Sequence, residues 1–318
     1  MAYDIIGDIH GQADKLVSLL RRMGYRHRSG AWRHPDRTAI FVGDFIDRGP
    51  RQLDTIRVVR EMLDAGTAQA VMGNHEFNAI AWYMPDPECD GQHLRRRVPK
   101  NREQHQAFLA ETESDSALHT EVVAWFLELP LWLDLPGLRV VHACWHPGFM
   151  AQLEPTLRPG RKLDPALIAA ASRRGSMEFC AVETLTKGIE VELPSGHEFV
   201  DKGGHRRHNV RVRWWDRSAD TFRKSALIGS PERADALPDL PIPESARIGY
   251  AGDKPVFFGH YWWTGTPAPQ ADHVACVDYS AGVGGPLVAY RWDGESVLDA
   301  RNFVSQAGEI VHAEASVQ

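Results

Sequence analysis

The sequence predicts an α/β protein: its composition indicates a globular chain, and two patterns along the sequence indicate the class. Its 43 % apolar and 25 % charged content is that of an ordinary globular protein. Over the first 80 residues, short apolar runs typical of buried strands alternate with amphipathic runs typical of helices. This rhythm implies βαβ crossovers and parallel strands. The last third of the chain returns to a strand pattern without intervening helices.

The first 80 residues carry the clearest elements. Leu16, Leu19, Leu20 and Met23 recur at helical spacing before Gly24, which is a natural stop. A second amphipathic stretch through Ile56, Val59 and Leu63 ends at Gly66. We expect strands at 3–6, 38–42 and 68–72, and helices over 12–23, around 56–66 and from Glu76 onward.

The remainder is less regular. Residues 85–127 are polar and helical in pattern, which favours a helical insertion on the surface. Residues 150–250 give a weak signal, typical of an accessory segment. We expect a single domain over 1–318 that contains both. Further strands are expected at 131–142 (a pair around Pro-Gly), 189–193, 210–215, 255–260, 273–278 and 287–292.

Composition and charge exclude several classes of protein. A formal net charge of −6 argues against a general nucleic-acid binder. The chain shows no signal-peptide pattern and no apolar run of membrane-spanning length. Its four cysteines are scattered without a CxxC pair, which fits reduced thiols. These features predict a soluble, cytoplasmic protein that does not bind membranes. The oligomeric state does not follow from them.

Polar clusters follow each of the first three predicted strands. They are Gly7-Asp8-Ile9-His10-Gly11, Gly43-Asp44-Phe45-Ile46-Asp47-Arg48-Gly49 and Gly73-Asn74-His75-Glu76. In open α/β sheets, functional groups gather where the carboxyl ends of neighbouring strands meet. Two later strands end in His142 and His260. We therefore expect these side chains to share one rim.

The side chains in these clusters are those of a metal site. Carboxylate, amide and imidazole groups without thiolates suit Mn²⁺, Fe²⁺ or Zn²⁺. Several carboxylates on one rim would repel each other unless cations compensate their charge. The sequence thus predicts a divalent metal site at this edge.

Five motifs, GDIHG, GDFIDRG, GNHE, VHA and GH, occur in that order between residues 7 and 260. Together they resemble the signatures of the PPP-type calcineurin-like metallophosphoesterases, which include protein phosphatases and bacterial diadenosine tetraphosphatases. A lone GDxHG would be weak, but five ordered motifs are specific. The resemblance implies a β-sandwich of mixed sheets flanked by helices (αββα).

The resemblance also implies two divalent metal ions, with Mn²⁺ the first choice and Fe, Zn, Ni or Co as alternatives. Asp44 would bridge the two ions. The implied ligands of the first ion are Asp8 and His10, and those of the second are Asn74, His142 and His260.

Further roles follow from the same resemblance. A hydroxide bridging the two ions would attack phosphorus directly. Arg48 would hold the phosphoryl oxygens together with Asn74, and His75 would protonate the leaving group while Asp47 orients it. Arg213 is the expected second phosphate-binding arginine. An alternative interpretation makes His75 a structural helix cap.

The substrate stays open at this point. Asp47 in "IDRG" and the "NHE" motif favour a phosphomonoesterase, acting on phosphoserine, phosphothreonine, phosphotyrosine or aryl phosphates. The ending "VDYSAGVGGPLVAYRW" resembles the tetraphosphatase branch, so the alternative is a dinucleoside polyphosphate or RNA-end hydrolase. A non-catalytic metal-dependent binding protein ranks last. The expected partner is a phosphorylated protein or a small phosphoester.

Other residues allow two interpretations each. His146 is either a second-shell or loop residue or a third metal ligand. The tryptophans of the 214–215 and 262–263 pairs belong either to the core or to a substrate cleft. The run Arg95-Arg96-Arg97 is either a solvated helix face or an anion-binding site.

Overall fold

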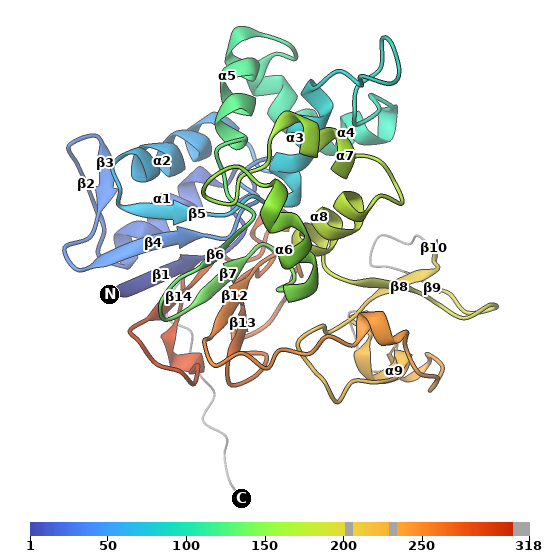
Figure 1. Cartoon of the computed structure of the whole chain (residues 1–318). Helices are drawn as coiled ribbons and strands as arrows, with labels where there is room; N and C mark the ends of the chain where they lie inside the picture. The colour runs from blue at the N-terminus through green and yellow to red at the C-terminus, as the bar shows by residue number, and fades with distance from the viewer. Residues whose placement is uncertain (201–205, 229–233, 308–318) are drawn as a thin grey trace, which may run out of the picture.

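The computed structural model describes residues 1–200, 206–228 and 234–307. Two mixed sheets form its centre (Figure 1). The five-stranded sheet has the order β15-β14-β1-β4-β5, and the four-stranded sheet has the order β13-β12-β7-β6. Their strands are β1 (Ala2–Ile6), β4 (Arg37–Phe41), β5 (Ala68–Ala70), β14 (Val288–Trp292), β15 (Phe303–Ser305), β6 (Trp132–Asp134), β7 (Arg139–Val141), β12 (Val256–Phe258) and β13 (Val274–Cys276).

Each sheet has a parallel part with antiparallel strands at an edge. In the larger sheet β1 pairs in parallel with β4, and β4 with β5, whereas β14 runs antiparallel to β1. In the smaller sheet β12 pairs in parallel with both β7 and β13, and β6 is antiparallel to β7. Six parallel strands therefore deliver their carboxyl ends to the rim.

The two sheets pack face to face through alternate side chains. Ile5 and Ile40 of the larger sheet share one buried cluster with Val140 and Phe257 of the smaller sheet. The rings of Phe257 and Tyr290 meet across this interface, with centroids 5.0 Å apart. Because neighbouring residues in a strand point to opposite faces, Phe41 contributes to the other buried cluster, on the helix side.

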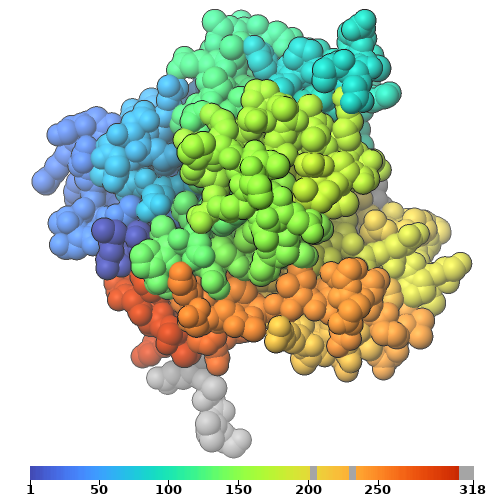
Figure 2. Space-filling view, viewed as in Figure 1, coloured from blue at the N-terminus to red at the C-terminus, as the bar shows by residue number. Residues whose placement is uncertain are grey.

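Helices cover both outer faces, which confirms the αββα prediction. They are α1 (Ala13–Arg22), α2 (Gln52–Asp64), α3 (Asn74–Tyr83), α4 (Pro99–Thr112), α5 (Ala117–Phe126), α6 (Pro147–Leu153), α7 (Pro165–Ala171), α8 (Met177–Lys187) and the short α9 (Phe222–Ser225). The yellow-green segment that contains α6 to α8 covers the front of the molecule (Figure 2).

Small elements complete the described chain. They are the strands β2 (Arg26–Arg28), β3 (Ala31–Arg33), β8 (Glu190–Glu192), β9 (Phe199–Val200), β10 (Arg206–Arg207) and β11 (Asn209–Arg211), and the 3₁₀ turns η1 (Glu154–Thr156), η2 (Glu244–Ala246), η3 (Ala281–Val283) and η4 (Ala300–Asn302). No helix in the described ranges is long and apolar enough to cross a bilayer.

Two expectations about local structure were wrong. The 85–127 segment is helical only from Pro99 onward, and it is not merely superficial, because Phe108, Val123 and Phe126 are buried in the core cluster. The strand expected at 210–215 ends at Arg211, and the chain then turns. Trp214 and Trp215 are buried and pack against Phe258 of β12, which supports their interpretation as core residues.

Candidate active site

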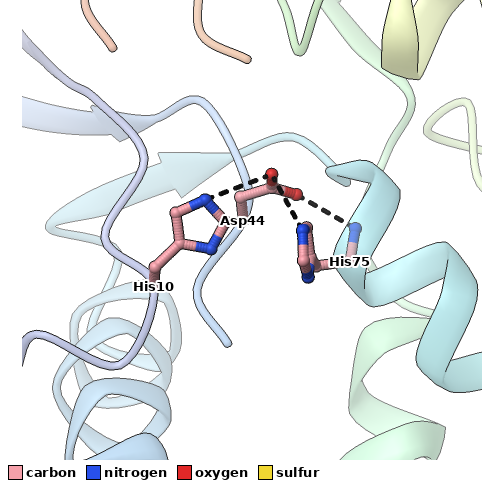
Figure 3. A group of neighbouring side chains, drawn as sticks. All are labelled: His10, Asp44 and His75. Carbon is pink, nitrogen blue, oxygen red and sulfur yellow. Dashed lines mark hydrogen bonds and ion pairs between the residues drawn. The ribbon is translucent and has the colours of Figure 1, made fainter. Parts of the chain in front are cut away.

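Asp44 lies at the centre of the rim and gathers three imidazoles. Its Oδ2 is 3.3 Å from His142 Nε2, 3.7 Å from His10 Nε2 and 3.9 Å from His75 Nε2. Figure 3 shows the His10 and His75 rings turned toward this carboxylate from opposite sides. His10 and His142 come from the loops after β1 and β7, and His75 from the first turn of α3, so one carboxylate joins groups from both sheets.

Hydrogen bonds orient two of these rings for metal binding. The Nδ1 atom of His10 lies 2.9 Å from the Ile46 carbonyl, and that of His142 lies 2.6 Å from the Val42 carbonyl. A carbonyl accepts only, so each Nδ1 carries the proton, and in the neutral ring Nε2 presents a lone pair. Burial lowers the pKa of His10 to about 4, which favours its neutral form.

Several buried atoms at the rim have no protein partner, which tests whether a metal would fit. Asp8 Oδ1, His10 Nε2 and both ring nitrogens of His260 are buried without a hydrogen bond. Such atoms are costly to bury unless an ion or water binds them. Ligand atoms of Asp44, His142 and His260 all lie within 4.8 Å of one another, as do those of Asp44, His10 and His75. The residues present fit divalent cations.

Asn74 and Asp8 complete this set. Asn74 Oδ1 is 3.2 Å from His142 Nε2. Asp8 Oδ2 accepts the His260 backbone N–H at 2.9 Å. Gly259 has to be glycine, since a Cβ there would lie 1.9 Å from Asp8 Oδ1. The structure thus brings all six predicted ligand residues to one place.

Asp278, which sequence reasoning missed as a site residue, adds a further buried carboxylate. Burial and the Asp278 charge raise the pKa of Asp8 well above its usual range. Burial also raises the pKa of Asp278 itself to about 6. Three buried carboxylates close together need positive charge, which two cations would supply. The position of Asp278 just after β13 was the sequence signal that could have identified it as a site residue.

The rim backbone is strained. Among the described residues, eleven non-glycine positions have positive φ, and seven of them belong to the rim: His10, Asp44, Asp47, Arg48, His260, Trp262 and Ser280. The Asp278 carboxylate accepts the backbone N–H of Trp262 at 2.7 Å and of Ser280 at 2.9 Å, which braces two of these residues. Strain of this kind persists only where surroundings enforce it.

Glu76 fixes two of the loops to each other. Its carboxylate accepts the backbone N–H groups of Asp44 and Phe45 at 2.8 Å each, and that of Gly73 at 2.9 Å. Sequence reasoning missed this role. The signal was a glutamate three residues after Gly73 at a helix start, the spacing of a capping box.

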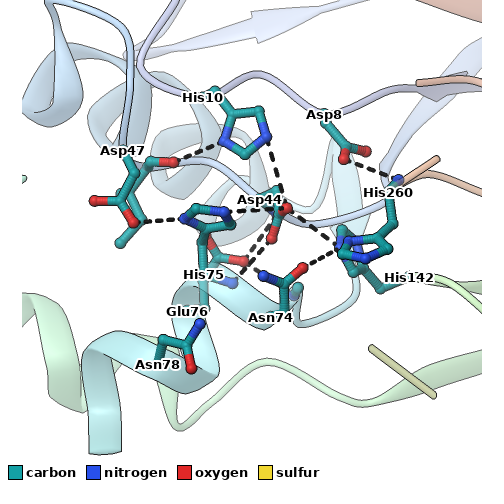
Figure 4. Close-up of polar contacts among 12 residues, drawn as sticks. Asp8, His10, Asp44, Asp47, Asn74, His75, Glu76, Asn78, His142 and His260 are labelled. Atoms are coloured by element: carbon teal, nitrogen blue, oxygen red, sulfur yellow. Dashed lines mark hydrogen bonds and ion pairs between the residues drawn. The ribbon is translucent and has the colours of Figure 1, made fainter. Parts of the chain in front are cut away.

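Asp47 lies between two histidines. Its Oδ2 is 2.5 Å from His75 Nδ1, and its Oδ1 is 2.9 Å from His105 Nδ1. Although burial raises it, the two imidazoles hold the pKa of Asp47 well below its usual range. The ionised carboxylate keeps a proton on His75 Nδ1, so the ring presents Nε2 to the site (Figure 4). The cap interpretation of His75 is wrong, since Gly73 and Glu76 cap this helix.

Arg48 is exposed at the mouth of the site and rests on an aromatic ring. Its guanidinium carbon lies 4.1 Å from the centroid of Trp262. This cation–π contact orients the charge while leaving its N–H groups available to an anion. Trp262, which is partly exposed, therefore belongs to the site, unlike Trp214.

The expected role of Arg213 stays a prediction, because no contact joins its side chain to the rim residues in the described part of the chain. Its side chain is exposed, and it lies in the turn that follows the end of the strand at Arg211. Arg211 lies 5.3 Å from the Tyr261 ring centroid, and its charge helps to lower the pKa of His260, after burial. Arg211 is therefore the arginine of this strand that neighbours the site.

His146 takes no part in the cluster of ligand atoms. Its Nδ1 accepts the backbone N–H of Phe149 at 3.1 Å and so caps α6. Among the described residues it belongs to neither group that could hold a metal. This supports the loop interpretation over a third metal ligand.

Comparison with known proteins agrees with the resemblance seen in the motifs. Residues 1–146 match the family model of the calcineurin-like phosphoesterases. A bis(5'-nucleosyl)-tetraphosphatase PrpE [asymmetrical] from Halalkalibacterium halodurans is 38 % identical over 147 residues, which are 44 % of this chain and 55 % of that protein. The same-named protein of Bacillus subtilis is 42 % identical over 76 residues, 24 % of this chain and 31 % of that protein.

Solved structures give a more distant likeness. A serine/threonine phosphatase from Saccharomyces cerevisiae aligns with a TM-score of 0.49 at 15 % identity, covering 96 % of this chain and 78 % of that one. A cold-active protein-tyrosine phosphatase of a Shewanella species aligns with a TM-score of 0.48 at 16 % identity, covering 96 % and 80 %. The chain spans about half the length, at most, of the curated relatives it matches.

Proposed function

We propose, from the match of residues 1–146 to the family model of the calcineurin-like phosphoesterases, that this chain is a metal-dependent phosphoric ester hydrolase. The observation that carries the proposal is the convergence of three imidazole Nε2 atoms on Asp44 Oδ2, at 3.3 to 3.9 Å. Buried atoms without partners surround this point.

The proposed ligands of two divalent ions, with Mn²⁺ the first choice, are Asp8, His10, Asp44, Asn74, His142 and His260. When bound, such ions supply an activated water and hold phosphoryl oxygens. Asp44 would touch both ions, because His10 and His142 approach the same oxygen from different loops.

Three further residues act on the substrate in this proposal. Arg48, oriented by Trp262, binds the phosphoryl oxygens, and Asn74 is the second residue that contacts them. His75 donates a proton from Nε2 to the leaving oxygen. Burial lowers the pKa of His75, but the charges of Asp44 and Asp47 outweigh it and raise that pKa, so the ring holds a proton to give.

We propose a dinucleoside polyphosphate as the substrate. The relatives that match this chain are named as asymmetrical bis(5'-nucleosyl)-tetraphosphatases. Sequence analysis placed this class second, behind phosphomonoesters, and the relatives favour the reverse order. Asymmetrical cleavage of diadenosine tetraphosphate would release a nucleoside triphosphate and a monophosphate.

Phosphomonoester hydrolysis remains the second candidate because of one observation. The His75–Asp47 pair, 2.5 Å apart, provides an acid for poor leaving groups such as the serine or tyrosine oxygen. Anhydride leaving groups need such help less.

A panel of substrates tests both candidates. Diadenosine tetraphosphate, phosphopeptides and p-nitrophenyl phosphate are compared with Mn²⁺, and metal content is measured after purification. We expect two ions per chain, turnover that EDTA abolishes, and kcat/KM at least about tenfold higher for the tetraphosphate, or about 1.4 kcal/mol. Preference for phosphopeptides would move the second candidate to first place, and metal-independent turnover would overturn the proposal.

A further inference from the structure

The three arginines 95 to 97 differ in their partners. Arg97 forms an ion pair with Asp115 at 2.7 Å, and Arg96 is exposed. Arg95 is partly buried, and its Nη1 and Nη2 donate to the side-chain oxygens of Asn78 and Gln104, each at 2.8 Å. Arg95 and Arg97 both reach α3, since Arg97 donates to the Trp82 carbonyl, but of these two only Arg97 has a carboxylate partner among the described residues.

The charge of Arg95 has no counter-charge in contact with it. Amides orient a guanidinium but do not neutralise it, and no carboxylate of the described chain forms an ion pair with Arg95. The acidic groups that act on it from further away are Asp47 and Glu183. Asp47 is shared by two histidines, and Glu183 is paired with Lys187.

Burial lowers the pKa of the Arg95 guanidinium, which reports the cost of removing this charge from water. A partly buried cation without a counter-ion is unfavourable unless an anion binds beside it. A guanidinium held in a fixed orientation is well suited to phosphate oxygens, which it can bind with two parallel hydrogen bonds.

The place of Arg95 defines which part of a substrate it would meet. Its partner Asn78 follows His75 by three residues on α3, so the two side chains are neighbours on one helix face (Figure 4). Both are partly exposed, whereas the residues between them are buried. His75 is the proposed donor to the leaving group, so Arg95 lies on the leaving-group side.

We propose that Arg95 forms an anion subsite beyond His75 that binds the phosphates of the leaving group in a polyphosphate substrate. This rests on the proposed function and deepens it, because it separates two substrate classes by charge. A nucleoside triphosphate leaving group carries phosphates into this subsite. The phenol or serine released from a monoester carries none.

The test compares Arg95→Gln with the matched control Arg96→Gln, a change of the same kind at the exposed neighbour. With Mn²⁺ present, kcat/KM is measured for diadenosine tetraphosphate and for p-nitrophenyl phosphate. We expect Arg95→Gln to lose about 10- to 100-fold on the tetraphosphate and no more than about twofold on the aryl phosphate. Arg96→Gln should lose no more than about twofold on either.

A second variant separates anion binding from a tether between α3 and α4. Arg95→Lys keeps the positive charge but loses the paired N–H donors of the guanidinium. It should therefore retain more activity on the tetraphosphate than Arg95→Gln. Inhibition by inorganic tripolyphosphate should weaken in Arg95→Gln, while inhibition by inorganic phosphate should not change. Equal losses on both substrates, or unchanged inhibition by tripolyphosphate, overturn the inference.

Failure of the proposed function looks different, since the unmodified protein would then hydrolyse neither substrate with any metal. In that event, calorimetry of tripolyphosphate binding to the Mn²⁺-treated protein still tests whether Arg95 forms an anion subsite. Loss of binding in Arg95→Gln but not in Arg96→Gln supports the subsite, and equal binding in both refutes it.

Discussion

The strand-end loops and the α4–α5 segment both reach the site, but they do so in different ways. Asp8, Asp44, His142 and His260 lie in the loops after β1, β4, β7 and β12, and Asn74 begins α3 after β5; each lies within four residues of a strand end. The α4–α5 segment contributes His105 from the middle of a helix, and Arg95 from the loop before it. The side chains at the strand ends would bind metal and phosphate directly. His105 would instead act on the site indirectly, through its contact with Asp47.

This difference between direct and indirect contributions indicates which residues of the site tolerate substitution. A residue whose side chain meets the metal or the phosphorus has no substitute, while a residue that orients another can be replaced by one with the same donor. Ranking variants by the size of their effect should reproduce this division between rim and support.

The largest effect is expected at the centre of the rim. Asp44→Asn removes the charge that three histidines and two proposed ions share, and should lower Mn²⁺-dependent kcat by about 10³-fold or more. Metal content per chain, measured after dialysis, should fall as well. Asp54→Asn is the control, because Asp54 pairs with Arg51 and Arg57 on the surface. A fully active Asp44→Asn protein would contradict the two-metal proposal.

The next effect tests the accessory segment, which carries Arg211 beside the Tyr261 ring and an exposed Arg213. A charged hydrogen bond to phosphate is worth about 1.5–3 kcal/mol, so Arg211→Gln should lower kcat/KM by about 10- to 100-fold. Arg213→Gln should change it by less than about twofold. Both variants are assayed under the same conditions. A larger loss in Arg213→Gln than in Arg211→Gln would support Arg213, the arginine expected from the sequence.

A smaller, selective effect is expected in α4. His105→Phe removes the donor to Asp47, loosens the orientation of His75, and should slow substrates with poor leaving groups by about tenfold. Phenyl phosphate is compared with 2,4-dinitrophenyl phosphate, which needs no acid and should slow by about twofold or less. His105→Gln keeps an N–H donor and should recover part of the loss. Uniform slowing of both substrates would mean that His105 is only a packing residue.

The smallest effect concerns stability and pH. The pKa of Asp47 is lower in the folded chain than in the unfolded chain, where it is about 3.9. Its contribution to the free energy of unfolding is thus fully present above about pH 4 and is lost as pH falls further. We expect metal-free protein to lose about 1–2 kcal/mol from this group, and His105→Phe to lose less. Urea unfolding of both proteins between pH 5 and 3 measures these losses. If the free energy of unfolding fell equally with pH in both, the coupling between Asp47 and His105 would be contradicted.

The sequence predicted those parts of the site that depend on local order. Asp44 and His142 were predictable because a strand end fixes where the next few residues go. His105 and Arg95 were not, since their positions depend on how α4 packs against α3, and residues 85–127 show no motif. Arg213 was expected from the family resemblance on a strand over 210–215, but that strand ends at Arg211 and Trp214 and Trp215 serve the core after a turn.

The left-handed residues of the rim have a consequence for engineering. An L-residue in this backbone region costs about 1–2 kcal/mol relative to glycine, and seven such residues surround the site. Selection for heat resistance alone would therefore favour glycine at positions such as Asp47 or His260. Such substitutions would relieve the backbone strain but also remove the side chains that the site needs. The same seven positions are where we expect thermal selection and functional selection of this protein to conflict most directly.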